Sequence, residues 1–294
     1  FRGVILFLYK NISINFTLSY FENMPIYLQW VIVVFAWDLC FYWSHRLHHN
    51  TNLLWKIHHT HHQPEHFNLS LGIRNSWFQP LSSFPFFSIL AFLGVPLEQF
   101  LVVSGVHYFI QFFNHNAFVI NAGFLEKILM TPSHHRVHHA KNEQYLGKNM
   151  GGTFIIWDKL FGTFQMERKD VEIKYGTVDN VNPKNPFIAN LSPLMNNIFR
   201  KIKQKNKNRQ HIDVKDFYTI SGSFFLFLLF LIYINYEQTW SFESLAPLFA
   251  IVFSGTTALG GISNGRKIGL VVWLLLAIPI TILYIVVLEI TEPY

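Results

Sequence analysis

Eleven of the chain's fifteen histidines gather in two short stretches. The first runs from His45 to His62 and reads HRLHHNTNLLWKIHHTHH, and the second, TPSHHRVHH, ends at His139. Neutral imidazole is the usual nitrogen ligand for iron, zinc, copper and nickel. The two stretches therefore predict a metal centre built from histidine side chains.

The spacing of these histidines predicts which of them share a helical face. Offsets of three and four residues place side chains on one side of an α-helix, whereas His59 faces away from His58 and His62. His115, at the end of an apolar stretch, is expected on the same side of the membrane, and His107 is expected to pack or support. The candidate ligands are His45, His49, His58, His61, His62, His115, His135, His138 and His139. A structural zinc site takes four ligands, so nine histidines predict two ions with four or five nitrogens each.

Three functions are compatible with such a centre. Two iron ions could share the electrons needed to split O₂ and attack a C–H bond of a lipid, by hydroxylation or desaturation. A metal transporter or other metal-binding membrane protein without redox chemistry would be expected to place ionisable residues near mid-membrane. A zinc hydrolase usually keeps three protein ligands and an open water position. Histidines in this number, at the margin of the membrane, favour the oxygen-activating enzyme.

The elements that must position the histidines are transmembrane helices. Hydrophobic residues make up 51% of the chain and charged residues only 14%, well below the roughly 25% of a soluble domain. A single cysteine, Cys40, excludes an intrachain disulfide. We expect an all-α integral membrane protein, a transmembrane helical bundle with a histidine-rich di-metal cap. The expected spans are 26–44, 77–93, 97–113, 217–235, 245–262 and 268–288.

One acid lies inside the first expected span. Asp38 precedes His45 by seven residues, two helical turns away on the same face. An ionisable residue within a span is costly and marks a functional position by default. We expect Asp38 to accept a ring N–H from a ligand histidine. The alternative is an acid near the end of the helix that is exposed to the membrane interface.

Composition divides the chain into four regions. Residues 1–25 form an N-terminal segment that begins at Phe1 rather than Met, so we expect a preceding piece to be missing. Residues 26–190 form the catalytic domain, residues 191–216 a basic juxtamembrane linker, and residues 217–294 the C-terminal transmembrane helices.

Basic residues predict the orientation in the membrane. Six of the ten residues in 200–209 are Lys or Arg, which suits attraction to anionic lipid head groups. This segment, the loop 264–267 and both histidine stretches are expected on one side, which the positive-inside rule makes cytoplasmic. Nothing else in the sequence supports nucleic-acid binding, so we expect none.

Three histidine boxes appear with characteristic neighbours. The first is Asp38…Tyr42-x-x-His45-Arg46-x-x-His49, and the second is Trp55-x-x-His58-x-x-His61-His62, followed by Asn68 and Arg74. The third, Thr131 to His139, precedes Asn149 and Trp157-Asp158-Lys159-Leu160-Phe161-Gly162-Thr163. Over roughly residues 26–190 the chain resembles the fatty acid hydroxylase superfamily, also called the sterol desaturase family. Within that superfamily, residues 45–163 are most similar to the alkylglycerol monooxygenases.

The resemblance implies an integral-membrane di-iron enzyme that uses O₂ to hydroxylate or desaturate a lipid taken from the bilayer. It carries the ligand role to the nine histidines above and leaves out His48, His59 and His134. It also implies an electron donor, a tetrahydropterin in the alkylglycerol enzymes, and an ether lipid or sterol as substrate. Those enzymes carry an acid where this chain has Asn50. The supporting residues that it indicates are Asp38, Tyr42, Asn68, Arg74 and Asp158.

Overall fold

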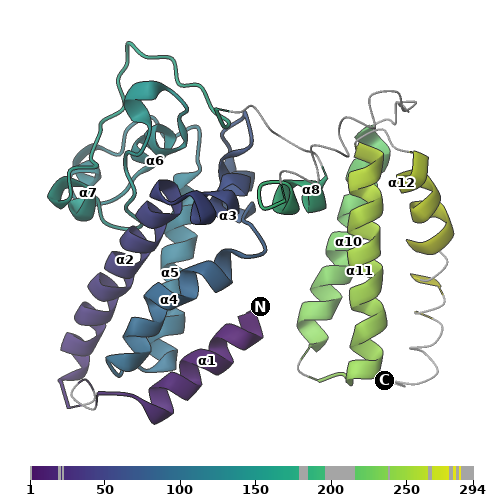
Figure 1. Ribbon diagram of the computed structural model, residues 1–294, viewed down its shortest axis with the longest axis horizontal. Coiled ribbons are helices and arrows are strands. Elements are labelled where there is room, and N and C mark those ends of the chain that lie inside the picture. The colour runs from purple at the N-terminus through teal and green to yellow at the C-terminus, as the bar shows by residue number, and fades with distance from the viewer. Residues whose placement is uncertain are drawn as a thin grey trace. The chain divides into compact units, whose positions relative to one another are not determined.

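The computed structural model divides into two compact units, residues 1–182 and 183–294, which are described separately (Figure 1). Within the part of the chain that it describes, the structure is helical, and β-pairing is confined to two isolated bridges, Leu129 with Phe154 and Ala140 with Tyr175. The described residues are 2–18, 21, 23–178, 185–195, 216–237, 239–263, 267–277, 281–282 and 285.

The first unit contains seven α-helices among its described residues, joined by short 3₁₀ turns. The α-helices are α1 (Arg2–Asn15), α2 (Ile26–Asn50), α3 (Asn52–His62), α4 (Gln79–Phe92), α5 (Leu97–Asn114), α6 (Pro132–His139) and α7 (Ile156–Leu160). The 3₁₀ turns are η1 (Leu69–Ile73), η2 (Gly123–Lys127) and η3 (Glu143–Tyr145).

Helix α2 carries the first histidines into the site. It is apolar and long enough to cross a membrane, and it continues to Asn50, six residues beyond the span expected at 26–44. Its last two turns therefore present His45 and His49 on the same rigid element as the span. Thr51 then adopts an extended conformation (φ −112°, ψ 131°), and α3 starts at once in a new direction.

Helices α4 and α5 form the expected hairpin, which turns at Gly94 in a left-handed conformation (φ 87°). Both helices pack against α2, and α1 packs on α4. With 14 residues, α4 is about 21 Å long, shorter than the roughly 30 Å hydrocarbon layer. The structure therefore corrects one expectation: the hairpin forms, but α4 is too short to span a membrane alone.

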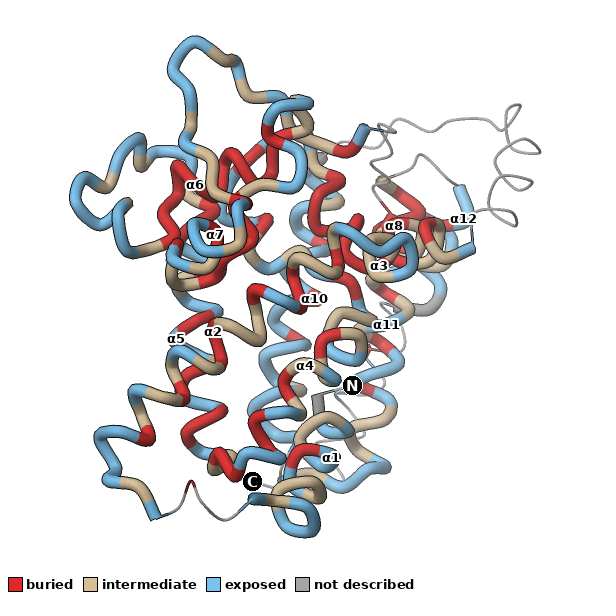
Figure 2. Tube along the Cα trace, turned by 60° about the vertical axis from the view of Figure 1, so that its left-hand side comes forward, coloured by how far each residue is buried: buried red, intermediate tan, exposed pale blue. Residues whose placement is uncertain are grey.

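The core of this unit lies between α2 and the hairpin. Trp37 is almost fully buried, and its ring centroid lies 4.6 Å from that of Phe87 and 4.3 Å from that of His107. Figure 2 shows buried positions along the inner sides of these helices and throughout α6. The apolar core thus holds the helices that end at the histidines.

The second unit contains α8 (Pro186–Leu191), α10 (Asp216–Tyr236), α11 (Phe242–Ser263), α12 (Lys267–Val272) and a π-helical turn, η4 (Trp273–Ala277). Helices α10 and α11 are long and apolar enough to cross a membrane and correspond to the spans expected at 217–235 and 245–262. Together with α2, they are the three helices in the described part of the chain that are long and apolar enough to cross a membrane. The protein is therefore an all-α integral membrane protein. The basic segment 200–209, positions 264–266 and most of 278–288 lie outside the described residues.

Candidate metal centre

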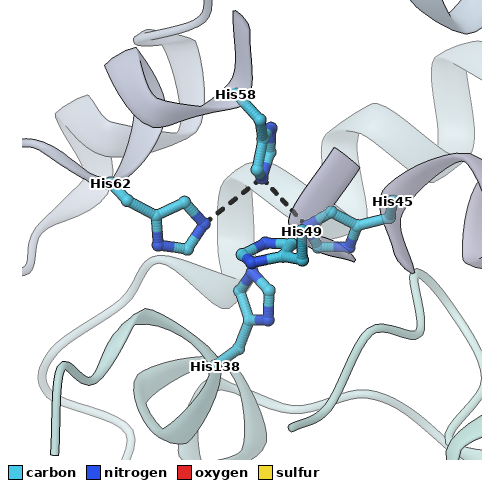
Figure 3. A group of neighbouring side chains, drawn as sticks. All are labelled: His45, His49, His58, His62 and His138. Carbon is cyan, nitrogen blue, oxygen red and sulfur yellow. Dashed lines mark hydrogen bonds between the residues drawn. The ribbon is translucent and has the colours of Figure 1, made fainter. Parts of the chain in front are cut away.

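Five histidines converge on one point, and they come from the end of α2, from α3 and from α6. Figure 3 shows their rings converging. One ligand nitrogen from each lies within 4.8 Å of those of the others. His58 is central, with its Nε2 3.1 Å from His45 Nε2 and 3.2 Å from His62 Nε2. We call this group the five-histidine cluster: His45, His49, His58, His62 and His138.

A second group forms beside it from α3, the end of α5 and α6. His115 Nε2 lies 3.0 Å from His135 Nε2, 3.2 Å from His139 Nε2 and 3.4 Å from His61 Nε2. We call this group the four-histidine cluster: His61, His115, His135 and His139. The structure thus brings together all nine histidines expected as ligands, and α3 contributes to both clusters because His61 and His62 are adjacent.

The hydrogen bonds of His61 and His115 indicate that their Nε2 atoms are arranged to bind a cation. A backbone carbonyl only accepts, so His61, whose Nδ1 lies 3.0 Å from Arg74 O, and His115, whose Nδ1 lies 2.7 Å from Gln111 O, each donate through Nδ1. In the neutral rings Nε2 then carries a lone pair, and these two lone pairs face each other. The arrangement is repulsive unless a cation lies between them.

Distances and unsatisfied atoms agree with this interpretation. Nitrogens bound at about 2.1 Å to one ion lie about 3.0–3.4 Å apart at octahedral or tetrahedral angles, the range seen here. His49 Nε2 and His138 Nε2 are buried without any hydrogen-bond partner. Such atoms carry a desolvation cost that a bound ion would remove. The residues present therefore fit a two-metal site.

Burial also keeps the imidazoles neutral. It lowers the pKa of His61 to about 4 and those of His115 and His138 to about 3. It lowers the pKa of His58 and His135 well below 6.5, and neighbouring histidines add to the effect. Only a neutral imidazole can bind a metal, so these rings are in the ligand state at neutral pH.

Five other histidines in the described part of the chain lie outside both clusters; His66 is exposed, and the other four are hydrogen-bonded as follows. His48 bonds to Ser44 O through Nδ1 and to Ser82 Oγ through Nε2. His59 Nδ1 accepts from the side chain of Gln63. His134 Nδ1 lies 3.3 Å from Thr131 Oγ1, and His107 Nδ1 lies 2.9 Å from Thr153 Oγ1. Each of these four rings is engaged by protein groups instead of facing a cluster.

Asp38 acts on different groups from those expected. Instead of a ligand histidine, it accepts from Thr153 N (2.7 Å), Phe154 N (3.0 Å) and Trp157 Nε1 (2.9 Å), and it lies 3.3 Å from His107 Nδ1. Seven residues along a helix correspond to about 10 Å, too far for a direct contact with His45. His45 Nδ1 donates to Met150 O, 2.9 Å away.

The other expected supporting residues divide into those near the clusters and one that is not. Arg74 accepts from His61 through its carbonyl, and its guanidinium donates to Thr60 O (3.1 Å) and Gln63 Oε1 (2.8 Å). Asp158 accepts from Met150 N and Gly151 N.

Tyr42 hydroxyl lies 3.0 Å from Thr163 Oγ1 and accepts from Arg46. Asn68 is exposed and caps η1 through Ser70 N. Its side-chain oxygen accepts from the backbone and the hydroxyl of Ser70, within η1.

Sequence reasoning missed the groups that fix the ring protons. These are the backbone carbonyls of Lys148 and Met150, which have no side-chain signature. It also missed Phe67, a buried ring with its centroid 5.5 Å from that of His139 and 5.8 Å from that of His115. Phe67 packs beside the four-histidine cluster, and a phenylalanine side chain carries no chemistry that would mark this role in the sequence.

Fold and site together define a helical membrane protein with two adjacent histidine clusters that could hold metal ions. The family model "Fatty acid hydroxylase" matches residues 30–163, which contain all nine cluster histidines. Residues 30–163, somewhat less than half of the chain, are therefore similar to the fatty acid hydroxylase family.

Several curated proteins share this region. Alkylglycerol monooxygenase of Homo sapiens is 40% identical over 158 residues, covering 54% of this chain and 35% of that protein. The alkylglycerol monooxygenase of Danio rerio is 44% identical over 142 residues, covering 48% and 32%. Ornithine lipid hydroxylase OlsE of Rhizobium tropici is 32% identical over 144 residues, covering 49% and 44%. The chain spans about a third of the length of these monooxygenases. No solved structure matches the chain.

Proposed function

We propose that the chain is the catalytic part of a membrane-bound, di-iron, O₂-dependent oxidoreductase that hydroxylates or desaturates a lipid. The observation that carries the proposal is the pair of adjacent clusters, with five and four histidine nitrogens gathered within ligand distance. Nitrogen ligation of this kind suits iron and excludes the oxygen-preferring ions magnesium and calcium. Two bound irons would supply the electrons that cleave O₂ and the oxidant that attacks a C–H bond.

The chain's own residues prepare and protect this centre. The carbonyls of Met150 and Arg74 hold ring protons on the far side of His45 and His61 and so aim each Nε2 inward. Phe67 limits water around the four-histidine cluster. Hydroxylation would place one oxygen atom of O₂ in the lipid and the other in water, with two electrons and two protons taken from a donor and solvent.

The membrane supplies the substrate in this proposal. The clusters lie at the end of α2, a membrane-spanning helix, so a lipid could approach from the bilayer. The similarity to alkylglycerol monooxygenases makes an alkylglycerol the first lipid to test and a tetrahydropterin the first reductant. We propose that the histidines face the cytoplasm and that the basic segment 200–209 contacts anionic head groups.

The test is oxygen incorporation by the purified, iron-loaded chain. It is incubated with an alkylglycerol, a sterol and a fatty-acyl lipid in turn, under ¹⁸O₂, with a tetrahydropterin or another reductant. The proposal expects one ¹⁸O atom in the product of one lipid, or a new double bond if that lipid is desaturated. Metal transport by the chain in liposomes, with no oxidised lipid under any reductant, would contradict it and favour a carrier.

A further inference from the structure

A segment between α6 and α7 runs alongside both α2 and α6. We call residues 148–154, KNMGGTF, the strap. Asp38 and Asp158 accept from four of its backbone amides: Met150, Gly151, Thr153 and Phe154. Both carboxylates are almost fully buried, with exposures of 1% and 0%. Amide N–H groups stabilise the negative charge of a buried carboxylate. Releasing one of them would leave that charge poorly solvated, so the carboxylate holds these donors firmly.

One peptide group links Asp158 to a cluster histidine. Gly151 N donates to Asp158 Oδ2 at 2.7 Å, and the carbonyl of the same peptide, Met150 O, accepts from His45 Nδ1 at 2.9 Å. The peptide is trans, so its N–H and C=O point in opposite directions. The carboxylate on one side therefore fixes the carbonyl that orients His45 on the other.

The peptide group between Lys148 and Asn149 links Asp158 to a second histidine in a similar way. Asn149 N donates to Thr163 O at 2.9 Å, and Lys148 O accepts from His138 Nδ1 at 3.0 Å. Thr163 is itself held by Asp158, because its hydroxyl donates to Oδ1 at 2.6 Å and its N–H to the Asp158 carbonyl at 2.9 Å. Asp158 thus acts on two histidines, on α2 and on α6.

Both of these histidines belong to the five-histidine cluster. In the four-histidine cluster, His61 and His115 donate instead to Arg74 O and Gln111 O, which lie outside the strap. The link to Asp158 therefore distinguishes one metal position from the other.

We propose that Asp158 is a positioning residue for the metal in the five-histidine cluster, acting on His45 and His138 through two strap peptides. The inference rests on the proposed function. A carboxylate that accepts the ring proton of a metal-binding histidine orients the ring and raises its basicity. Here a peptide group stands between carboxylate and imidazole, and its polarised carbonyl passes on the same effect.

The experiment measures iron binding at the two positions separately. The full chain is expressed, stripped of metal in detergent and titrated anaerobically with ⁵⁷Fe²⁺, with iron per chain and Mössbauer spectra as readouts. Asp158→Asn keeps the shape of the side chain but turns an NH₂ group toward one of the amide donors. We expect it to weaken one of two iron positions by about 10–100-fold and leave the other unchanged. Asp170→Asn is the matched control, because Asp170 is exposed and pairs with the exposed Arg168.

A second variant covers the case in which Asp158→Asn does not fold. In Gly151→Ala the new Cβ would lie 2.7 Å from Asp158 Oδ2 and 2.7 Å from Phe154 O, so the strap must move although the carboxylate remains. Gly105→Ala is its control, because nothing lies within 4 Å of that Cβ. Selective loss of one iron in either folded variant supports the inference, and two irons bound with unchanged affinity in both would overturn it. If the unmodified chain binds fewer than two irons, the proposed function itself fails.

Discussion

The two histidine clusters differ in where their ring protons are held. In the five-histidine cluster, both rings donate to carbonyls of the strap: His45 to Met150 O, 105 residues away in sequence, and His138 to Lys148 O, 10 residues away. In the four-histidine cluster, His115 donates to Gln111 O, one turn earlier on its own helix, and His61 to Arg74 O, 13 residues away. His45 in the five-histidine cluster therefore depends on long-range packing, whereas His138, His61 and His115 use carbonyls within 13 residues of their own positions. Damage to distant parts of the fold should reach them unequally.

Removing a ligand from each cluster should have the largest effect. We expect His138→Ala and His61→Ala each to abolish turnover and to lose iron first from the variant's own cluster. The loss in affinity should exceed about 100-fold, because even supporting residues contribute about 10–100-fold. Mössbauer spectra of the two variants should then retain different single-iron signals. Full activity in either variant would contradict the ligand assignment.

Changing Arg74 should damage only the four-histidine cluster. Its guanidinium ties the segment after α3 to Thr60 O and Gln63 Oε1, so Arg74→Gln loosens the carbonyl that receives the His61 proton. We expect about 10-fold weaker binding at one iron position, opposite to the one affected by Asp158→Asn. Arg168→Gln, at an exposed arginine, is the control. If Arg74→Gln and Asp158→Asn weaken the same position, the two clusters do not differ as described.

Tyr42→Phe should have a smaller effect, on the five-histidine cluster. It removes a hydroxyl that lies 3.0 Å from Thr163 Oγ1, the group that donates to Asp158. One hydrogen bond contributes about 0.5–1.5 kcal/mol, so iron affinity at that position should fall about 2–10-fold. Anaerobic iron titration measures the change. An effect on the four-histidine position would break the proposed path through Thr163.

The smallest effect is expected for His59→Ala. His59 lies between ligands in sequence but bonds to Gln63, the residue that caps the C-terminus of its helix. The variant should keep two irons per chain and most of its turnover, measured beside His61→Ala. Loss of metal in His59→Ala would show that the helical face has been assigned wrongly.

The residues that sequence could predict are those whose chemistry is in the side chain. Histidines at offsets of three and four residues fall on one helical face, so the sequence alone predicts that His58 and His62 lie together. The carbonyls of Lys148 and Met150 could not be predicted, because every residue has a carbonyl and only tertiary packing aims it.

Asp38 illustrates the limit of a face argument. Its position on the same side of α2 as His45 is a matter of angle, whereas contact also depends on the rise along the axis. The strap lies next to Asp38, and the backbone amides of Thr153 and Phe154 donate hydrogen bonds to its carboxylate. The short α4 is a similar case, since apolar composition marked 77–93 but did not show where the helix would begin and end.

We propose that the two clusters form one di-iron centre. Its most direct test is ⁵⁷Fe Mössbauer spectroscopy on the detergent-purified chain after growth in iron-supplemented medium, with iron counted per chain. We expect two irons per chain, in unequal environments that reflect five and four nitrogen ligands, and magnetically coupled when oxidised. One iron or none under these conditions would contradict it.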